Sequence, residues 1–380
     1  MIFFVKNKLR NFDKMRRQKL HLLENLMYRL IKNDSALETA LVPNDQVKRI
    51  LLMRNNKRIG NILFFIPLVR QVRHAYPNAT IDLLLSQPWQ GQFFDGLGMD
   101  RIYYSHFSFM GILKWLKAIE HLNQVKYDLI LAPNCCASDA TTAAMIAAKN
   151  KVSSYKERRI LAFPHSLKIS LCRPHAAYGC LSLLEALGHP LDKPLNHNLA
   201  FSNDELSQGI IASRKYTTQD DSIDLVFFRG ARGAKHLPPA IWEAILKKFE
   251  VGIDKKINWI EVLSPDVNET LRKNTAIFET KNLRLLGAFL RNFDGFICCD
   301  TGPLHLADAS GVPCVGLYTH TTPGSFGLLG EKSVHVTDIN NFNASEVVRK
   351  LGLVIKQRLT LKKDYKRSPA LLHDVYPAAV

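Results

Sequence analysis

The 380-residue sequence has no apolar run that approaches the roughly 18 residues needed by a membrane-spanning helix. The beginning of the sequence lacks a cationic region followed by an apolar region of sufficient length, so we expect no secretory signal. The seven cysteines include no C-x-x-C pair, which argues against a zinc site and, with the expected absence of a signal, favours a reducing, cytoplasmic location. No G-K-[ST] sequence completes a Walker loop.

Acidic residues are scarce relative to basic ones, and the formal net charge is +17. Residues 1–33 carry +7 of this charge and residues 345–380 carry +5. Basic ends favour an anionic partner such as nucleic acid, acidic lipid or a phosphorylated glycolipid. We disfavour nucleic acid because no binding module and no basic stripe interleaved with aromatics is present. Residues 14–33 have helical apolar spacing, which suits a helix on a membrane surface or one docked on its own domain.

Short apolar runs alternate with amphipathic stretches from residue 48 onward, a pattern that predicts parallel sheets covered by helices. A proline-containing linker at 189–203 separates two such regions. We predict an α/β chain of GT-B-like design, with two doubly wound Rossmann-like domains facing a cleft. The expected segments are a basic amphipathic extension (1–45), a first domain (46–200), a second domain (201–345) and a basic tail (346–380). The expected strands are 49–53, 81–85, 102–105, 128–132, 224–228, 257–263, 295–299 and 314–318, and the expected helices are 61–76, 109–122, 139–149, 175–188 and 238–249.

Residues 299–307 have the pattern of a strand, a tight turn and a helix. Pro303 suits a first helical turn, and Thr301 and Gly302 bring backbone N–H groups to a helix N-terminus, which attracts phosphate. Asp300 ends the strand where open α/β sheets bind ligands, and His305 follows about half a turn into the helix. The segment therefore predicts a site for a phosphorylated ligand. The alternative is an ordinary turn in which Asp300 caps the helix.

A second loop, residues 229–236, is rich in glycine and cations. Gly230 and Gly233 permit close backbone approach, while Arg232 and Lys235 supply positive charge. The loop is suited to hold a diphosphate, although a solvated basic turn would have the same composition. A third loop, residues 58–61, opens the first predicted helix of the N-terminal half.

These stretches together resemble the bacterial lipopolysaccharide heptosyltransferases, glycosyltransferase family nine, over roughly residues 48–345. The segment 300–307 matches the donor motif of that family and is the most specific of the signals. The other matching stretches are residues 59–67, 68–70, 76–82, 127–130, 183–188 and 230–235.

The resemblance implies a GT-B fold in which the N-terminal half binds an acceptor, the phosphorylated inner core of lipopolysaccharide, and the C-terminal half binds ADP-heptose. Transfer would invert the anomeric centre and need neither a metal nor a cofactor besides the nucleotide sugar. The basic ends would then meet the acceptor and the inner face of the inner membrane as a peripheral protein. For the donor diphosphate the resemblance implies Thr301 and Gly302 together with Gly230, Arg232 and Gly233, and it implies Lys235 for the leaving ADP. His305 and Asp300 would contact the sugar or order the loop. Glu269 or Asp266 would bind the ribose hydroxyls.

The sequence departs from the family pattern at Asn61, where the family has the aspartate expected to act as general base. An amide side chain can form hydrogen bonds but does not take up a proton at working pH. Three alternatives follow. Another carboxylate replaces the aspartate, with Asp139 as the first candidate; the transferase is slow and relies on leaving-group stabilisation; or the chain is a non-catalytic binding or assembly protein. A second departure lies at 319–324, where the family has a Gly-Pro-Thr turn.

Overall fold

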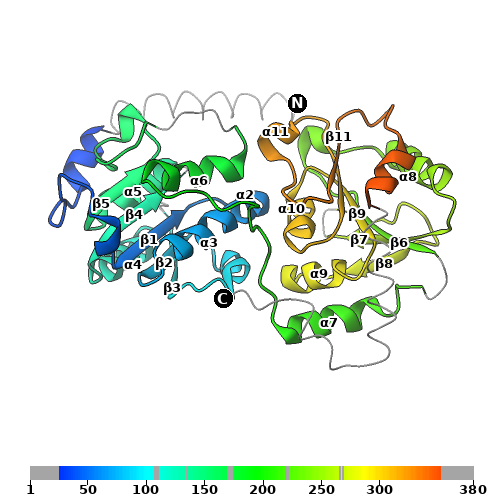
Figure 1. The fold of residues 1–380 in the computed structure, drawn as a ribbon, viewed down its shortest axis with the longest axis horizontal. Coiled ribbons are helices and arrows are strands. Elements are labelled where there is room, and N and C mark those ends of the chain that lie inside the picture. Colours follow the sequence, from blue (N-terminus) through cyan, green and yellow to red (C-terminus); the bar gives the residue numbers. More distant parts are fainter. Residues whose placement is uncertain are drawn as a thin grey trace. The chain divides into compact units, whose positions relative to one another are not determined.

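The computed structural model describes residues 25–106, 111–133, 136–168, 174–218, 222–264, 267 and 269–351. The chain divides into two compact units, residues 1–196 and 197–380, and the division falls inside the predicted linker. Each unit contains a parallel sheet with helices around it (Figure 1). The predicted fold class, an α/β chain with two Rossmann-like sheets, is confirmed.

The sheet of unit 1 has five parallel strands in the order β3-β2-β1-β4-β5. The order reverses at β1, since the chain runs outward from β1 to β3 and then crosses to β4. Ligands bind at such a switch point in open α/β sheets. The strands are β1 (Arg49–Arg54), β2 (Thr80–Leu85), β3 (Arg101–Tyr104), β4 (Tyr127–Ala132) and β5 (Ala148–Ser153).

Helices cover both faces of this sheet. Leu122 of α4 and Ala140 of α5 share a buried cluster with Leu51 of β1, while the right-handed crossover rule assigns α3, which packs with α6, to the other face. The helices are α2 (Ile59–Leu63), α3 (Ile66–Ala75), α4 (Ile112–Asn123), α5 (Ala137–Met145) and α6 (Ala176–Ala186), with short 3₁₀ turns at Asn44–Gln46, Pro88–Phe94 and Glu157–Arg159.

Residues 25–31 are helical and dock on unit 1. Tyr28 is fully buried in the same cluster, and Met27 and Ile31 pack against it. The Lys151 ammonium, also buried, donates to the carbonyl oxygens of Asn33 (3.0 Å) and Ala144 (3.2 Å). The described part of the basic extension therefore lies against its own domain, whereas the earlier residues of the predicted helix lie outside the described residues.

The buried Lys151 makes stability depend on pH. Burial lowers the pKa of Lys151 from 10.5 to about 8, so between these values the unfolded chain binds the proton that the folded chain has released. Unfolding free energy should therefore rise with pH through this window, by roughly 3 kcal/mol, relative to Lys151→Met. Denaturant unfolding of both proteins from pH 7 to 10.5 measures the difference, and parallel pH profiles would contradict the assignment.

The sheet of unit 2 has six parallel strands in the order β11-β10-β9-β6-β7-β8. The strands are β6 (Ile223–Phe228), β7 (Ile257–Leu263), β8 (Ala276–Glu279), β9 (Gly295–Cys299), β10 (Cys314–Leu317) and β11 (Val334–Val336). The helices are α7 (Asn203–Ser213), α8 (Pro239–Gly252), α9 (Leu283–Leu290), α10 (Gly302–Ala309) and the short α11 (Pro323–Phe326), with a 3₁₀ turn at Gly233–Lys235 and a further helical stretch at 344–351.

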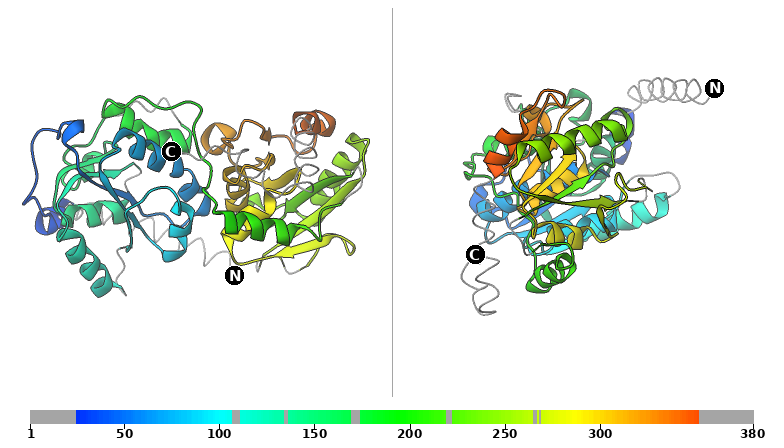
Figure 2. Two further views of the ribbon diagram at one scale, coloured as in Figure 1. Left: turned by 60° about the horizontal axis from the view of Figure 1, so that its bottom comes forward. Right: turned by 90° about the vertical axis from the view of Figure 1, so that its right-hand side faces the viewer.

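Two groups of helices enclose the unit 2 sheet. Trp242 and Phe249 of α8 pack with Phe227 of β6 in one core cluster. On the other side α7 and α9 lie side by side, as Figures 1 and 2 show. Their close approach depends on Gly209, because a Cβ there would meet the Ala288 carbonyl oxygen at 2.4 Å.

Several predicted boundaries are wrong. The helix expected over 61–76 is two helices, because Pro67 has no N–H to donate across the break and instead occupies the first turn of α3. The helix expected over 139–149 ends at Met145, where Ile146 turns to extended backbone and the chain enters β5. Strands β5, β8 and β11 and helices α7, α9 and α11 were not predicted.

Candidate functional site

The candidate site in unit 2 forms where β6, β9 and β10 end. In parallel strands these ends lie at one edge of the sheet, so the loops that follow them are neighbours. Lys235, in the turn after β6, places its ammonium 2.5 Å from Asp300 Oδ2 and 2.7 Å from the Asp300 carbonyl oxygen, just after β9. The two predicted donor segments, 230–235 and 300–305, therefore meet.

Asp300 joins three chain segments through one buried carboxylate. His305 Nε2 lies 2.9 Å from Oδ1, while Lys235 and the Thr321 hydroxyl donate to Oδ2. Burial alone would raise the pKa of Asp300, but the hydrogen bonds from His305, Lys235 and Thr321 lower it well below its usual range. The group is thus a carboxylate at neutral pH and orders the loops after β6, β9 and β10.

Asp300 is not the helix cap that the alternative interpretation required. Thr301 occupies the N-cap position of α10 in extended conformation, with Pro303 in the first turn as predicted. The Thr301 hydroxyl lies 3.2 Å from Cys298 Sγ. The positive end of the α10 dipole and the Lys235 ammonium consequently lie at the same end of the sheet, which is suited to an anion.

The loop at residues 229–236 has the backbone conformation that was predicted from its glycines. Gly233 has φ +64°, in the left-handed region that glycine favours. A Cβ on Gly230 would lie 2.3 Å from the Phe228 ring, so a larger residue would displace either the loop or that ring. Arg232 is exposed.

A buried ion pair supports this loop and was not predicted. Arg229 Nε lies 2.5 Å from Glu261 Oε1, and Glu261 is fully buried within β7. The second Glu261 oxygen accepts the Leu271 N–H at 2.8 Å, and Arg229 also donates to the Glu269 carbonyl oxygen. The pair joins the loop after β6 to residues 269–271.

The predicted ribose ligands are less well defined. Glu269 is exposed, and only its backbone takes part in the contact with Arg229. Asp266 lies outside the described residues. Within the divergent turn 319–324, Thr321 contacts Asp300, and His320 lies 3.0 Å from the neighbouring Thr319 hydroxyl.

In unit 1, Asn61 lies in the first turn of α2 and is partly exposed. Its carbonyl oxygen accepts from the buried Arg54 guanidinium at 3.3 Å. Asp139 lies in the first turn of α5, and its carboxylate accepts from the backbone N–H groups of Asn55 (3.1 Å) and Cys136 (3.3 Å). Burial raises the pKa of Asp139, and hydrogen bonds from Cys136 and Asn55 oppose that rise.

Sequence reasoning missed a polar cluster at the same edge of the unit 1 sheet. The buried Gln90 amide binds the Asn56 carbonyl oxygen and, through its own oxygen, the Ser86 N–H at 3.0 Å. His106, which follows β3, places Nδ1 3.2 Å from the Ser86 carbonyl oxygen and is partly exposed. The only signal available was the position of these residues immediately after β2 and β3.

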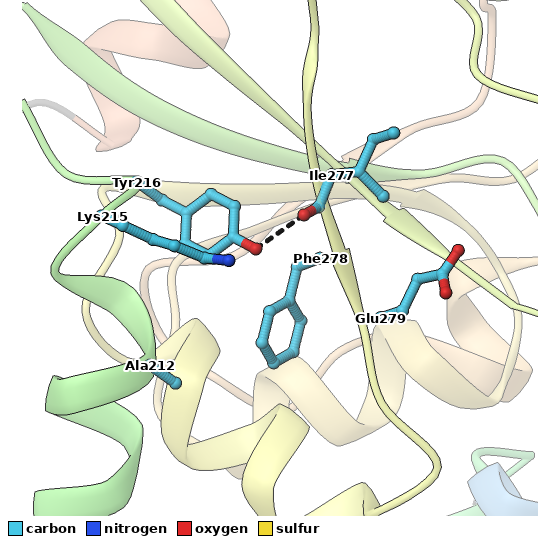
Figure 3. A pocket seen from close by; sticks show the side chains of 6 residues that line it. All are labelled: Ala212, Lys215, Tyr216, Ile277, Phe278 and Glu279. Atoms are coloured by element: carbon cyan, nitrogen blue, oxygen red, sulfur yellow. Dashed lines mark hydrogen bonds between the residues drawn. The ribbon is translucent and has the colours of Figure 1, made fainter.

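A pocket on the described surface of unit 2 lies away from these residues. It has a volume of about 430 Å³ and lies between the end of α7 and the edge strand β8, lined by Lys215, Tyr216 and Glu279 among others (Figure 3). Tyr216 donates its hydroxyl to the Ile277 carbonyl oxygen at 2.6 Å. None of the predicted site residues lines this pocket.

The described residues contain no cluster of three or more His, Cys, Asp or Glu side chains that could hold a metal ion. They also contain no helix of the length and apolarity required to span a bilayer.

Comparison with known proteins identifies relatives. Residues 115–352 match the family model described as glycosyltransferase family 9 (heptosyltransferase). Lipopolysaccharide heptosyltransferase 1 of Pseudomonas aeruginosa is 29% identical over 117 residues, which are 30% of this chain and 33% of that protein. The match thus spans about a third of the curated relative.

Solved structures show the same fold at low sequence identity. A glycosyl transferase family 9 protein from Veillonella parvula has a TM-score of 0.64 at 18% identity, covering 83% of this chain and 98% of its own. E. coli heptosyltransferase WaaC, solved with ADP, has a TM-score of 0.61 at 16% identity, covering 82% and 99%. E. coli ADP-heptose lps heptosyltransferase II has a TM-score of 0.63 at 17% identity, covering 81% and 99%.

Proposed function

Because the chain belongs to glycosyltransferase family 9, the heptosyltransferases, we propose that it transfers a heptose, or a related sugar, from ADP-heptose to the phosphorylated inner core of lipopolysaccharide. The observation that carries this proposal is the junction of Lys235, Asp300 and the α10 N-terminus at one end of the unit 2 sheet. That junction supplies one ammonium and one helix dipole, which suit the negative charge of a diphosphate.

In the proposed reaction the acceptor hydroxyl attacks the anomeric carbon from the face opposite the diphosphate. The bond between that carbon and the diphosphate oxygen breaks, the configuration inverts, and ADP leaves with the electron pair. Positive charge and N–H donors aimed at the leaving oxygen stabilise this step. Lys235 supplies that charge, Thr301 and Gly302 the backbone donors, and Asp300 holds Lys235 and His305 in position. No metal has a role in this scheme.

The acceptor hydroxyl must also lose a proton. Asn61 can position that hydroxyl but does not take up the proton. Asp139 is buried and already accepts two backbone N–H groups, so it serves as the third helical residue of the α5 capping box unless the loop around Asn55 moves. His106 is partly exposed at the same sheet edge, which makes it a second candidate base. We favour a slow transferase that relies on its leaving-group site.

The acceptor fits the charge of the chain. A net charge of +17 would attract a phosphorylated glycolipid and the anionic headgroups around it. We therefore place the protein in the cytoplasm, associated peripherally with the inner face of the inner membrane.

The first test is donor binding. Millimolar ADP-heptose should raise the melting temperature of the protein, since a ligand that binds only the folded state stabilises it by mass action. ADP alone should give a smaller rise, and UDP-glucose serves as the mismatched nucleotide sugar. No shift with ADP-heptose would count heavily against the proposal.

Asn61 keeps a second function open. A chain that binds the nucleotide sugar but transfers nothing, with either Asn or Asp at position 61, would be a binding or assembly protein on the same scaffold. Thermal stabilisation by ADP-heptose without turnover in either form would support that alternative.

A further inference from the structure

Helix α4 has one face fixed against unit 1. Trp115, Ile119 and Leu122 are buried at a spacing of three and four residues. The Trp115 indole N–H donates to the Thr142 hydroxyl on α5 at 3.0 Å, which anchors the helix. The opposite face of α4 is therefore held outward.

The outward face of the first turns is apolar and basic. Leu113 is 74% exposed, Leu116 40% and Ile112 39%. Leu116 lies four residues after Ile112 and three residues after Leu113, so it is a neighbour of both on the helix surface. Lys114 and Lys117 are exposed beside them. Farther along the helix the exposed residues change to Glu120 and His121, so the apolar surface is confined to the beginning of α4.

This surface begins at the edge of the unit 1 sheet where the candidate acceptor-side residues lie. A helix that follows a parallel strand begins at the carboxyl edge of the sheet and runs back along it. The beginning of α4, after β3, consequently lies at the same edge as Asn61 and Asp139, which open α2 and α5. Figure 1 shows α4 on the outside of unit 1.

We propose that Ile112, Leu113 and Leu116, with Lys114 and Lys117, form a docking surface for an anionic lipid bilayer. Leucines enter the boundary between headgroups and acyl chains, while lysine ammonium groups bind lipid phosphate above them. A protein partner is disfavoured, because its interface usually excludes lysine and requires a much larger apolar area. The proposal rests on the proposed function and deepens it, since membrane docking would bring the sheet edge with Asn61 and Asp139 close to a lipid-anchored acceptor.

The test uses the full chain and vesicles that contain no acceptor and no nucleotide sugar, so its failure is separate from failure of the transferase proposal. Partition coefficients are measured by co-sedimentation with two kinds of vesicle. One is phosphatidylcholine with about 30% phosphatidylglycerol, which is anionic, and the other is pure phosphatidylcholine. The double variant Leu113→Ser, Leu116→Ser should bind the anionic vesicles about tenfold less than wild type.

Two further variants make the result specific. Lys114→Gln with Lys117→Gln should lose about fivefold in affinity per lysine on anionic vesicles only. The matched control, Ile211→Ser with Val251→Ser, removes apolar side chains that are 63% and 78% exposed in unit 2, and its binding should equal that of wild type. Melting temperatures verify that each variant is folded.

Equal vesicle binding by wild type and the Leu113, Leu116 variant would overturn the proposal and assign binding to the basic ends. Light scattering that finds a wild-type dimer which the same variant dissociates would also overturn it, since the surface would then be an interface between copies of the chain.

Discussion

Lys235→Ala should lower kcat/KM for transfer from ADP-heptose by about 10²–10³, the usual cost of removing one positioned charge donor from a leaving or developing oxyanion. Its ammonium is the cation that the structure fixes at Asp300, 2.5 Å from Oδ2. Because the charge on the diphosphate grows as the bond to the sugar breaks, most of the loss should appear in kcat rather than in KM.

Two variants show whether this effect is specific. Lys235→Arg keeps the positive charge and should recover part of the activity. Lys247→Ala removes an exposed lysine from α8, away from the three loops, and should leave kcat/KM unchanged. If Lys235→Ala retained wild-type kcat with a normal melting temperature, the leaving-group role would be wrong.

Asn61→Asp should raise turnover by about 10²-fold, the lower end of what a positioned general base contributes. The substitution changes one amide to a carboxylate at the middle residue of the five-residue helix α2. The rate gained should depend on pH and decline as the new carboxylate is protonated, whereas the wild-type rate lacks that dependence. Single-turnover kinetics from about pH 4, near the ordinary pKa of a carboxyl group, up to about pH 8 measures both rates.

The other results separate the remaining possibilities. Unchanged turnover in Asn61→Asp would mean that a different group accepts the proton, and Asp139→Asn and His106→Ala would then identify it by a loss of about 10²-fold. Ser138→Ala, which changes a neighbour of Asp139 that contacts Asn55 at 2.9 Å, tests whether a loss merely reflects a disturbed loop.

Asp300→Asn should lower the unfolding free energy by roughly 2–3 kcal/mol, because it removes the carboxylate that pairs with the Lys235 ammonium and that binds His305 Nε2. The partial exposure of Lys235 reduces its share of this cost. The wild-type stabilisation should be present above about pH 4 and decline as pH falls towards the lowered pKa of Asp300, since below the ordinary value the unfolded chain binds the proton first. Asp254→Asn, an exposed aspartate of the same unit, is the control in denaturant unfolding at pH 3 and pH 7.

The sequence predicted the central strands well. Residues 257–263 and 295–299 coincide with β7 and β9. Strand β9 is a continuous apolar run, as expected of a buried parallel strand, and β7 is apolar apart from Asn258 and Glu261. Strand β5 was missed for the opposite reason. It buries the polar residues Asn150 and Lys151, and its first two residues were assigned to the end of the helix expected over 139–149. The short edge strands β8 and β11 offer only four and three residues of signal.

The same contrast applies to the site. The meeting of Lys235 with the Asp300 loop was predictable, because both follow strands that end at one sheet edge. The contact of Thr321 with Asp300, and the Arg229–Glu261 pair, depend on side-chain directions in three dimensions and left no spacing pattern in the sequence. The roles of Thr301, Gly302, His305, Arg232 and Glu269 towards the donor remain predictions.

The fully buried Glu261 has a consequence for how relatives of this chain can diverge. With Arg229 lost, a carboxylate would be left uncompensated in the interior. With Glu261 lost, the Arg229 guanidinium would lose its anionic partner and the Leu271 N–H would lose its acceptor. Either single replacement therefore gives a destabilised protein. In an aligned set of relatives the two positions should therefore covary, retained together or exchanged together for an apolar pair.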